Sequence, residues 1–400
     1  MERIIFHVDV NNAFLSWTAV YLLKNGYETD IRTIPSVIGG DEEKRHGIVL
    51  AKSPVAKKYG IKTAETLYLA RKKCPNVEVF PANYEYYCEQ SQNLYNYLSQ
   101  YTPLIEQFSV DECFMDLTNT KYLYDDILAL AYKIKDEIKN MFGFTVNVGI
   151  GNNKLCAKMA SDFQKPDKVH TLFNNEIELK MWPLPIEDLL YIGKSSSAEL
   201  KKLGINTIGD LAHTNVNYLQ KHFKNRSIDM INSANGIDNS PVNNDVSKNK
   251  CISVSSTLPE DTNNESELKQ ILLDMCDQVG LRARREGSFA RTIAITAKTS
   301  SFRSFSKQKK VSSPTNNTME IYNKVLEIFE ELDKNELIRN IGVRLSDLTD
   351  NRQEQISLFQ TNKKETDDSL QKLVDNINSK YKNTKIMPAI FYENKSNNDK

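Results

Sequence analysis

Apolar and polar positions recur along the first 172 residues with the periods expected of strands and helices. Continuous apolar runs predict buried strands at residues 3–10, 144–151 and 168–172. Apolar residues at helical spacing predict helices at residues 13–26, 84–100, 125–143 and 152–166. Residues 28–82 interrupt this order as a mixed insert, in which a strand leads into a short helix that ends at Gly60. The order predicts an α+β domain resembling a split βαβ core.

The stretch "EQFSVDECFMDLT", residues 106–118, places Asp111 and Glu112 next to each other inside an apolar run. We expect a hairpin or bent strand whose buried residues are Phe108, Val110, Cys113, Phe114, Met115 and Leu117. Adjacent strand residues point to opposite faces, and burying an unpaired carboxylate costs several kcal/mol. With Asp9 at the end of the first strand, three carboxylates can meet at one sheet edge and bind Mg²⁺ or Mn²⁺. The alternative is that Asp111 or Glu112 is an ordinary turn acid.

Residues 175–240 have a helical pattern of their own. Within "LLYIGKSSSAELKKLGINTIGDL" two helices are joined by a turn at Gly204, and a turn containing Gly193 precedes them. This arrangement is typical of a helix-hairpin-helix, whose turn amides can approach a phosphate backbone. A plain helical hairpin is the alternative. Residues 241–250 are polar and rich in Asn, which predicts a linker.

Residues 251–349 repeat a strand and helix pattern in the order β, α, β, β, α, β. In the third element Ile293, Ile295 and Ala297 alternate with residues of the other face, which are Thr292, Thr296 and Lys298. Between residues 280 and 315 nine bases accompany a single acid, Glu286. We expect this basic sheet to lie along phosphates, because the bases would otherwise repel one another; a merely solvated face is the alternative.

Composition indicates a multidomain protein with no membrane span. A chain of 400 residues predicts two to four domains, and it contains no apolar run near the roughly 18 residues that a span requires. The opening "MERIIFHVDV" lacks the apolar region of a signal peptide, so we expect a cytoplasmic protein. The six cysteines are scattered without metal-binding spacing, which favours reduced, structural thiols.

Five blocks of sequence together resemble Y-family DNA polymerases, the lesion-bypass enzymes of the DinB and UmuC type. They are "FHVDVNNAF", "FSVDECFMDLT", "VGIGNNKLCAKMASDFQKP", "LGINTIGDL" and "IRNIGVRLSDLTDNRQEQISLF", and they span about residues 3–360. The resemblance implies a right-hand polymerase that adds deoxynucleotides to a primer 3′-hydroxyl without proofreading. Its expected parts are a ferredoxin-like palm (1–27 and 83–174), fingers (28–82), a thumb (175–240), a linker (241–250), a little finger (251–349) and a tail (350–400).

The resemblance also implies roles for single residues. Asp9, Asp111 and Glu112 would ligate two Mg²⁺ ions, which Mn²⁺ can replace, with help from the carbonyl of Val10. Phe14 would be the steric gate that excludes a ribose 2′-hydroxyl. The nucleotide-binding residues would be Ser53, Lys57 and Lys165. Together with the basic strands and the hairpin turns, the expected DNA contacts are Arg291, Lys298, Arg303, Lys307, Lys309, Gly193 and Gly204.

Several positions depart from the family pattern. Where many DinB-type members have Asn-Tyr-x-Ala-Arg, this chain has Ser53 to Lys57, so the tyrosine that usually contacts the triphosphate is absent. Lysine in place of arginine can hold a phosphate but loses bidentate geometry. Ala51 replaces a usual Thr or Ser, Asn11 a second Asp, and Ala13 an aromatic residue. The contacts with the incoming nucleotide are therefore where this chain departs most from the family pattern.

The expected partners are primer-template DNA, deoxynucleoside triphosphates and the replicative sliding clamp. Gln355, Leu358 and Phe359 resemble a clamp-binding peptide, in which apolar anchors fill a pocket; core packing is the alternative. We expect a monomer. Two other functions compete with a polymerase: a catalytically silent DNA- and clamp-binding accessory protein, and a cyclic-dinucleotide cyclase suggested by "GGDEE" at residues 39–43. That motif lies in the insert instead of on the predicted hairpin, which disfavours the cyclase.

Overall fold

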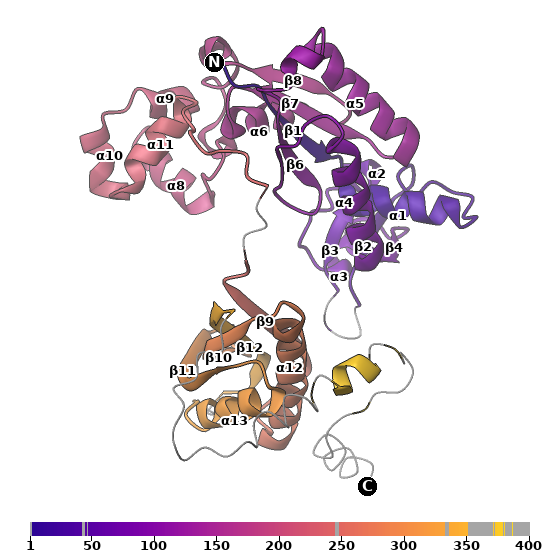
Figure 1. Ribbon diagram of the computed structural model, residues 1–400, viewed down its shortest axis with the longest axis vertical. Helices are drawn as coiled ribbons and strands as arrows, with labels where there is room; N and C mark the ends of the chain where they lie inside the picture. Colours follow the sequence, from indigo (N-terminus) through magenta and orange to yellow (C-terminus); the bar gives the residue numbers. More distant parts are fainter. Residues whose placement is uncertain are drawn as a thin grey trace. The chain divides into compact units, whose positions relative to one another are not determined.

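The computed structural model divides the chain into two compact units, Met1–Gly40 with Gly47–Val246 and Asp41–His46 with Ser247–Lys400 (Figure 1). It describes residues 2–350 except 42–44, 46, 245–247 and 333–335, and in the tail residues 371, 373–378, 380 and 386. None of the helices in these described parts has the length and hydropathy that a membrane span requires.

A five-stranded sheet forms the centre of the first unit. Its strands are β1 (Ile5–Val10), β5 (Ile105–Gln107), β6 (Glu112–Asp116), β7 (Val146–Gly151) and β8 (Val169–Leu172), in the order β5-β6-β1-β7-β8. β1 runs antiparallel to β6 and β7, while β7 and β8 are parallel. This is the α+β order that the apolar pattern predicts, with the chain returning through helices between strands.

The two faces of this sheet are covered by different helices. The even-numbered residues of β1 pack in a core with α1 (Ala13–Lys24), α4 (Tyr84–Leu98) and α5 (Ile127–Phe142). The odd-numbered residue Ile5 packs instead with Ala157 of α6 (Lys154–Asp162) and with Phe114. The alternation of β1 therefore directs His7 and Asp9 to the α6 face.

Glycines in β7 allow α6 to lie unusually close to the sheet. A Cβ atom at Gly149 would be 2.0 Å from the carbonyl oxygen of Ala157 and 2.4 Å from the amide nitrogen of Ser161. One at Gly151 would be 2.7 Å from the Ala157 amide nitrogen. Such distances are far inside van der Waals contact, so these two positions admit no side chain while the helix stays in place.

The expected strand around the paired acids is a hairpin in the structure. β5 and β6 pair antiparallel, and the chain turns between Gln107 and Glu112. The prediction of a buried Phe108 was wrong: its side chain is 41% exposed, because it lies in this turn. Phe114 and Met115, which follow the turn in β6, are buried as expected.

The insert between α1 and α4 forms a small sheet of its own. Its strands are β2 (Ser36–Gly39), β3 (Val49–Lys52) and β4 (Glu78–Pro81), in the order β3-β2-β4, with helices α2 (Pro54–Lys58) and α3 (Leu67–Lys73). Gly60 has φ of 76°, a left-handed conformation that ends the short helix as the sequence suggests.

Residues 174–234 are helical. The elements are η2 (Asn174–Glu176), α7 (Ile177–Lys180), η3 (Ile186–Asp188), α8 (Lys194–Lys202), α9 (Ile208–Ala212), α10 (Val216–Phe223) and α11 (Arg226–Ala234); the 3₁₀ helix η1 (Lys121–Leu123) lies earlier in the chain. Gly204 has φ of 82° between α8 and α9, and Gly193 caps α8. The predicted pair of helices with a glycine turn is present.

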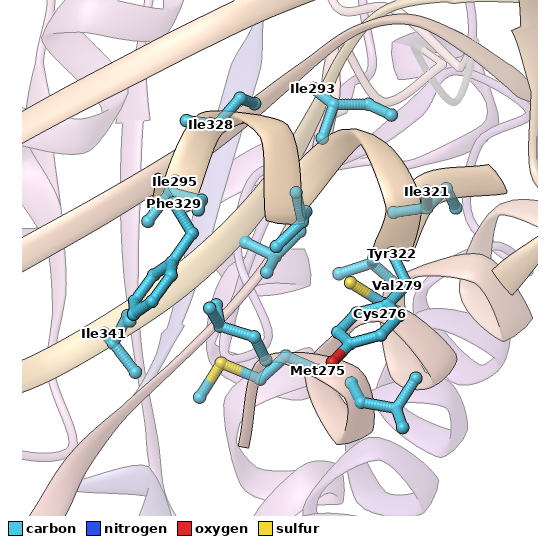
Figure 2. Packing of buried hydrophobic residues seen from close by; sticks show 14 of the residues in the cluster. Met275, Cys276, Val279, Ile293, Ile295, Ile321, Tyr322, Ile328, Phe329 and Ile341 are labelled. Atoms are coloured by element: carbon cyan, nitrogen blue, oxygen red, sulfur yellow. The ribbon is translucent and has the colours of Figure 1, made fainter. Parts of the chain in front are cut away.

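The second unit is a four-stranded sheet covered by two helices on one face. The elements are β9 (Cys251–Thr262), α12 (Glu265–Arg285), β10 (Phe289–Thr299), β11 (Ser304–Thr315), α13 (Thr318–Phe329) and β12 (Ile338–Thr349), with sheet order β11-β10-β12-β9. Figure 2 shows the core, where Ile293 and Ile295 of β10 face Ile321 and Ile328 of α13. The predicted β, α, β, β, α, β order and the apolar face of β10 are confirmed.

Candidate active site

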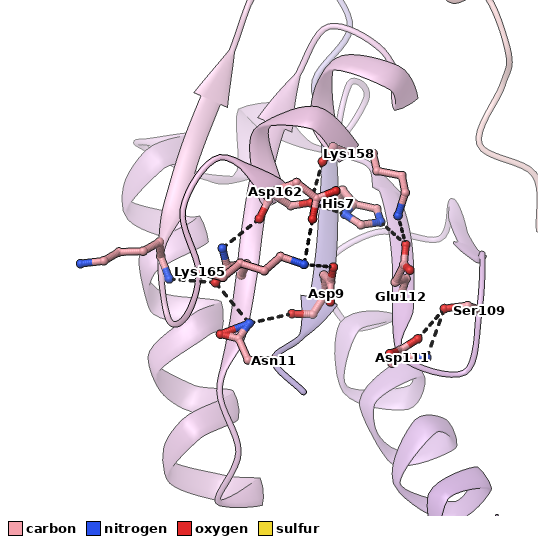
Figure 3. Close-up of polar contacts among 12 residues, drawn as sticks. His7, Asp9, Asn11, Ser109, Asp111, Glu112, Lys158, Asp162 and Lys165 are labelled. Atoms are coloured by element: carbon pink, nitrogen blue, oxygen red, sulfur yellow. Dashed lines mark hydrogen bonds and ion pairs between the residues drawn. The ribbon is translucent and has the colours of Figure 1, made fainter. Parts of the chain in front are cut away.

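Asp9 and Glu112 lie directly opposite each other on neighbouring strands. The register of β1 and β6 pairs Asp9 with Glu112, and both side chains are on the α6 face of the sheet (Figure 3). Ligand atoms of His7, Asp9 and Glu112 all lie within 4.8 Å of one another. Two of the three predicted acids are thus brought together, and a buried histidine joins them.

Asp111 is adjacent to this group but faces another way. It lies in the hairpin turn, where its carbonyl oxygen accepts a 3.0 Å hydrogen bond from the Val10 amide. The Ser109 hydroxyl donates to Asp111 Oδ1 at 2.7 Å (Figure 3). Among the described residues, its carboxylate is not part of the close group that contains Asp9 and Glu112.

Two lysines from the α6 region balance the charges of the facing acids. Lys165 Nζ lies 2.6 Å from Asp9 Oδ2 and 2.8 Å from Asp162 Oδ1. Lys158 donates to Glu112 Oε2. The ammonium groups of Lys165 and Lys158 therefore neutralise part of the negative charge of the two acids.

The two facing carboxylates have opposite pKa shifts. Burial raises the pKa of Asp9, and the nearby Lys165 offsets that effect only in part. Burial also acts to raise the pKa of Glu112, but hydrogen bonds from His7 and Lys158 outweigh it and lower the pKa to about 2. Glu112 is consequently held ionised by its protein partners, whereas the charge of Asp9 depends more on an added cation.

His7 was missed by the sequence analysis. Its ring is fully buried, with Nδ1 2.8 Å from Ser161 Oγ and Nε2 3.0 Å from Glu112 Oε2. Strand alternation could have placed it, since it precedes Asp9 by two residues and must share its face. Ser161 and Lys158, both on α6, could not be placed without knowing how that helix docks.

The donor set suits a hard divalent cation. Asp9 and Glu112 supply carboxylate oxygens, the ligands that Mg²⁺ and Mn²⁺ prefer, and Asp111 follows on the adjoining turn. The side chains of Asp9 and Glu112 are 11% and 20% exposed, so a solute can reach them while most of their surface is covered. Residues and donor chemistry therefore fit the expected metal site.

Phe14 lies on α1 beside a cluster of aromatic rings. It stacks on Tyr87 with ring centroids 4.7 Å apart and 11° between planes, and meets the edge of Tyr84 at 6.0 Å. The ring is half-buried and contacts the cores on both sides of α1. This position is compatible with a steric gate and with core packing, so the gate remains a prediction.

The remaining nucleotide candidates have different surroundings. Lys57 is exposed on the last turn of α2. Ser53 is buried; its hydroxyl accepts from the Ala56 amide as the cap of α2 and donates to the Ile34 carbonyl. Its side chain thus has a structural role. Asn11 is buried too: its side-chain oxygen accepts a 2.7 Å hydrogen bond from the Asp167 amide, and its side-chain nitrogen donates to the Asn147 side chain at 3.2 Å.

The bases of the second unit are divided between the two faces of its sheet. On β11, Lys307 and Lys309 share the helix face with Phe305 and Val311, which pack against the core. Lys309 Nζ lies 2.7 Å from Glu331 Oε1, Lys307 donates to the Glu331 carbonyl, and Arg303 lies 3.0 Å from Glu336. The premise that these bases lack acidic partners was wrong, because the acids come from later in the chain.

The opposite face carries another set of bases. Lys298 of β10 and Lys310 of β11 lie on that face, and Arg344 of β12 is paired with Ala294 of β10. In the described part of the chain these three bases form no ion pair, and Arg344 Nε is buried without a hydrogen-bond partner. Arg291 is exposed beside a β-bulge. At Gly193 and Gly204 an added Cβ would meet nothing within 4 Å, so both turns are open.

Comparison with solved structures identifies the class of fold. A Y-family DNA polymerase chimera matches with a TM-score of 0.75 at 24% sequence identity, covering 87% of this chain and 100% of that chain. The chain therefore has the α+β fold of Y-family polymerases.

Sequence comparisons identify the family. Residues 8–162 match the impB/mucB/samB family and residues 249–358 its C-terminal domain. The DNA polymerase IV of Clostridium acetobutylicum is 47% identical over 98% of this chain and 99% of its own length. That of Acetivibrio thermocellus is 33% identical over the full length of both, and that of Alkaliphilus oremlandii 36% identical over 97% of this chain and 99% of its own. The chain belongs to the impB/mucB/samB family.

Proposed function

We propose that this protein is a template-directed DNA polymerase of the lesion-bypass class, which adds deoxynucleotides to a primer 3′-hydroxyl. The observation that carries the proposal is the facing pair Asp9 and Glu112, with Asp111 on the adjoining turn. Acids gathered at a sheet edge suit phosphoryl transfer, in which catalysis is mainly positioning and charge stabilisation. The full-length relatives named DNA polymerase IV support the same reaction.

Asp9, Asp111 and Glu112 would hold the divalent cations, for which we propose two Mg²⁺ ions, with Mn²⁺ as a substitute and the Val10 carbonyl as a further ligand. Bound cations would supply activation of the attacking oxygen and neutralisation of phosphate charge. The chain's own part is to hold these oxygens at a buried edge. Lys165, which forms an ion pair with Asp9 in this structure, would also bind the triphosphate of the nucleotide.

Sugar and phosphate recognition would come from α1 and the insert. Phe14 would lie beneath the sugar, backed by the stacked ring of Tyr87, and exclude a 2′-hydroxyl by a clash. Exposed Lys57 would attract the phosphates as a point charge. Ser53 would act through the α2 helix that it caps, because its hydroxyl is already bonded.

DNA would lie on the sheet face of the second unit that the helices leave uncovered. Lys298, Lys310 and Arg344 project from that face among small and hydroxylated residues. Of the other bases expected from the sequence, Arg291 can contribute from its bulge, whereas Arg303, Lys307 and Lys309 must give up acidic partners first. The open turns at Gly193 and Gly204 would approach the backbone of the duplex.

The remaining partners follow from the sequence alone. Gln355, Leu358 and Phe359 would bind a sliding clamp; they lie outside the described residues. We also propose that the protein acts as a monomer in the cytoplasm.

Primer extension on an undamaged template tests the polymerase against a silent accessory protein. The wild-type protein should add deoxynucleotides in the presence of Mg²⁺, and a variant with Asp111→Ala and Glu112→Ala should add none. The variant's DNA affinity and melting temperature serve as controls for folding. Absence of incorporation by the wild type, or full activity in the variant, would refute the polymerase. Extension past a panel of defined lesions then tests the bypass class.

A further inference from the structure

The buried imidazole of His7 connects the active-site carboxylate Glu112 to helix α6. Its Nε2 lies 3.0 Å from Glu112 Oε2, and its Nδ1 lies 2.8 Å from Ser161 Oγ. The ring itself packs on Phe114, with centroids 4.6 Å apart. Both ring nitrogens thus have hydrogen-bond partners within the protein, and the ring is fully shielded from solvent.

The position of the ring proton follows from the bonds around it. A neutral imidazole donates through one nitrogen and accepts at the other. If Nδ1 carried the proton, Nε2 would place a lone pair 3.0 Å from a carboxylate oxygen, and two acceptors would face each other. The favourable arrangement is a proton on Nε2, donated to Glu112, with Nδ1 accepting from the Ser161 hydroxyl.

Ser161 can select this tautomer because its hydroxyl has a choice of acceptors. Its oxygen lies 2.8 Å from the carbonyl oxygen of Lys158 and 2.8 Å from His7 Nδ1. Donation to Nδ1 keeps that nitrogen unprotonated and leaves the ring proton on Nε2. The carbonyl alternative would force the unfavourable tautomer.

The donors that reach Glu112 converge on one of its oxygens. His7 and Lys158 both bond to Oε2, and within the described residues no hydrogen bond to Oε1 is formed. One oxygen is therefore bonded to protein donors, whereas Oε1 remains available on a residue that lies directly opposite Asp9 in the sheet.

We propose that His7 is a positioning residue, which holds Glu112 through Nε2–H so that Oε1 is presented to a divalent cation, and that Ser161 supports the same tautomer by donating to Nδ1. This inference rests on the proposed polymerase function. It differs from a packing role for His7, in which the ring would merely fill space against Phe114.

Two substitutions of His7 separate these roles. His7→Gln keeps an N–H donor near the place of Nε2 and an acceptor for Ser161, but removes the aromatic ring. His7→Phe keeps the ring and its packing on Phe114 but has no donor. A positioning role predicts that Phe is the more damaging change, whereas a packing role predicts that Gln is.

The readouts are the half-saturating Mg²⁺ concentration in single-turnover primer extension and direct Mn²⁺ binding followed by electron paramagnetic resonance. A hydrogen bond to a charged group is worth enough to change an equilibrium about ten- to hundredfold. We expect His7→Phe to weaken both metal measurements by about tenfold or more, and His7→Gln by much less, with DNA affinity equal in both. Equal effects, or the reverse order, would overturn the proposal. A wild type without polymerase activity would instead refute the function while leaving Mn²⁺ binding interpretable.

The tautomer is tested without catalysis by heteronuclear NMR of the full-length protein with labelled histidine. The chain has five histidines, and the signals lost in His7→Gln identify this one. We expect the ring proton on Nε2 in the wild type and also in Ser161→Ala, because Glu112 still accepts it there, but weaker Mn²⁺ binding in Ser161→Ala, whose ring is held at one nitrogen only. A wild-type ring protonated on Nδ1 would refute the donation to Glu112, and unchanged Mn²⁺ binding in Ser161→Ala would refute the role of Ser161.

Discussion

The two faces of the second sheet carry different sets of bases, which allows the DNA-binding face to be found by measurement. Lys298, Lys310 and Arg344 occupy the face away from the helices. Arg303, Lys307 and Lys309 instead contact acids that follow later in the chain, as shown by the 2.7 Å pair of Lys309 with Glu331. A triple change to Gln in either set removes the same charge.

The expected effects differ in size because only phosphate contacts release counterions. Each contact contributes about 0.9 to the slope of log affinity against log salt, so losing three should flatten that slope by about 2.7. Removing the paired set should flatten it by less than about one unit, since those bases are already neutralised by carboxylates. Its cost in stability should also be small, as exposed ion pairs contribute about 0–1 kcal/mol.

Fluorescence anisotropy of a labelled primer-template, titrated with each triple variant at a series of salt concentrations, measures both slopes. Melting temperatures of the two variants check that each remains folded. Equal flattening by both sets, or a larger effect from Arg303, Lys307 and Lys309, would refute the assignment of the face.

Three further predictions concern other parts of the chain. Phe14→Ala should raise ribonucleotide incorporation relative to deoxynucleotides by about tenfold or more, as a clash of about 1.4 kcal/mol suffices; unchanged kcat/KM ratios would make Phe14 a core residue. Ala at both Leu358 and Phe359 should abolish clamp-stimulated synthesis but spare synthesis without the clamp, and equal loss of both activities would indicate packing. Asp167→Asn should cost about 2 kcal/mol in urea unfolding at neutral pH, because it strips a partner from buried Lys135. Burial acts to raise the pKa of Asp167, but Lys135 and Lys139 lower it below the ordinary 3.8. The cost in stability should therefore vanish as the pH falls through the folded-state pKa. A cost that persists in acid would refute the pairing.

Elements with a strong local pattern could be predicted from the sequence. The alternation in β10 placed Ile293 and Ile295 in the core, and the apolar run of β1 placed Asp9 at a strand end. Phe108 was misplaced because its apolar character continues a strand pattern that the backbone leaves to form a turn. Hydrophobicity alone does not mark where a hairpin reverses.

The candidate site was predictable only as far as its acids. Asp9 and Glu112 were expected to meet, and the β1 and β6 register pairs them. The partners from α6, Ser161 and Lys158, depend on the docking of a helix that is distant in sequence. In the second unit, counting charges over a local window missed Glu331 for the same reason. Long-range pairing is a property of the fold, which local composition does not contain.

The absent side chain at Gly149 limits how this site can vary during evolution. A methyl group there would meet the backbone of α6 at Ala157 and Ser161, and the helix would have to move away from the sheet. Ser161 would then leave His7, and Lys158 would leave Glu112, although Gly149 itself touches neither acid. Among related sequences, we expect this position to tolerate replacement as poorly as the carboxylates themselves, and for a purely steric reason.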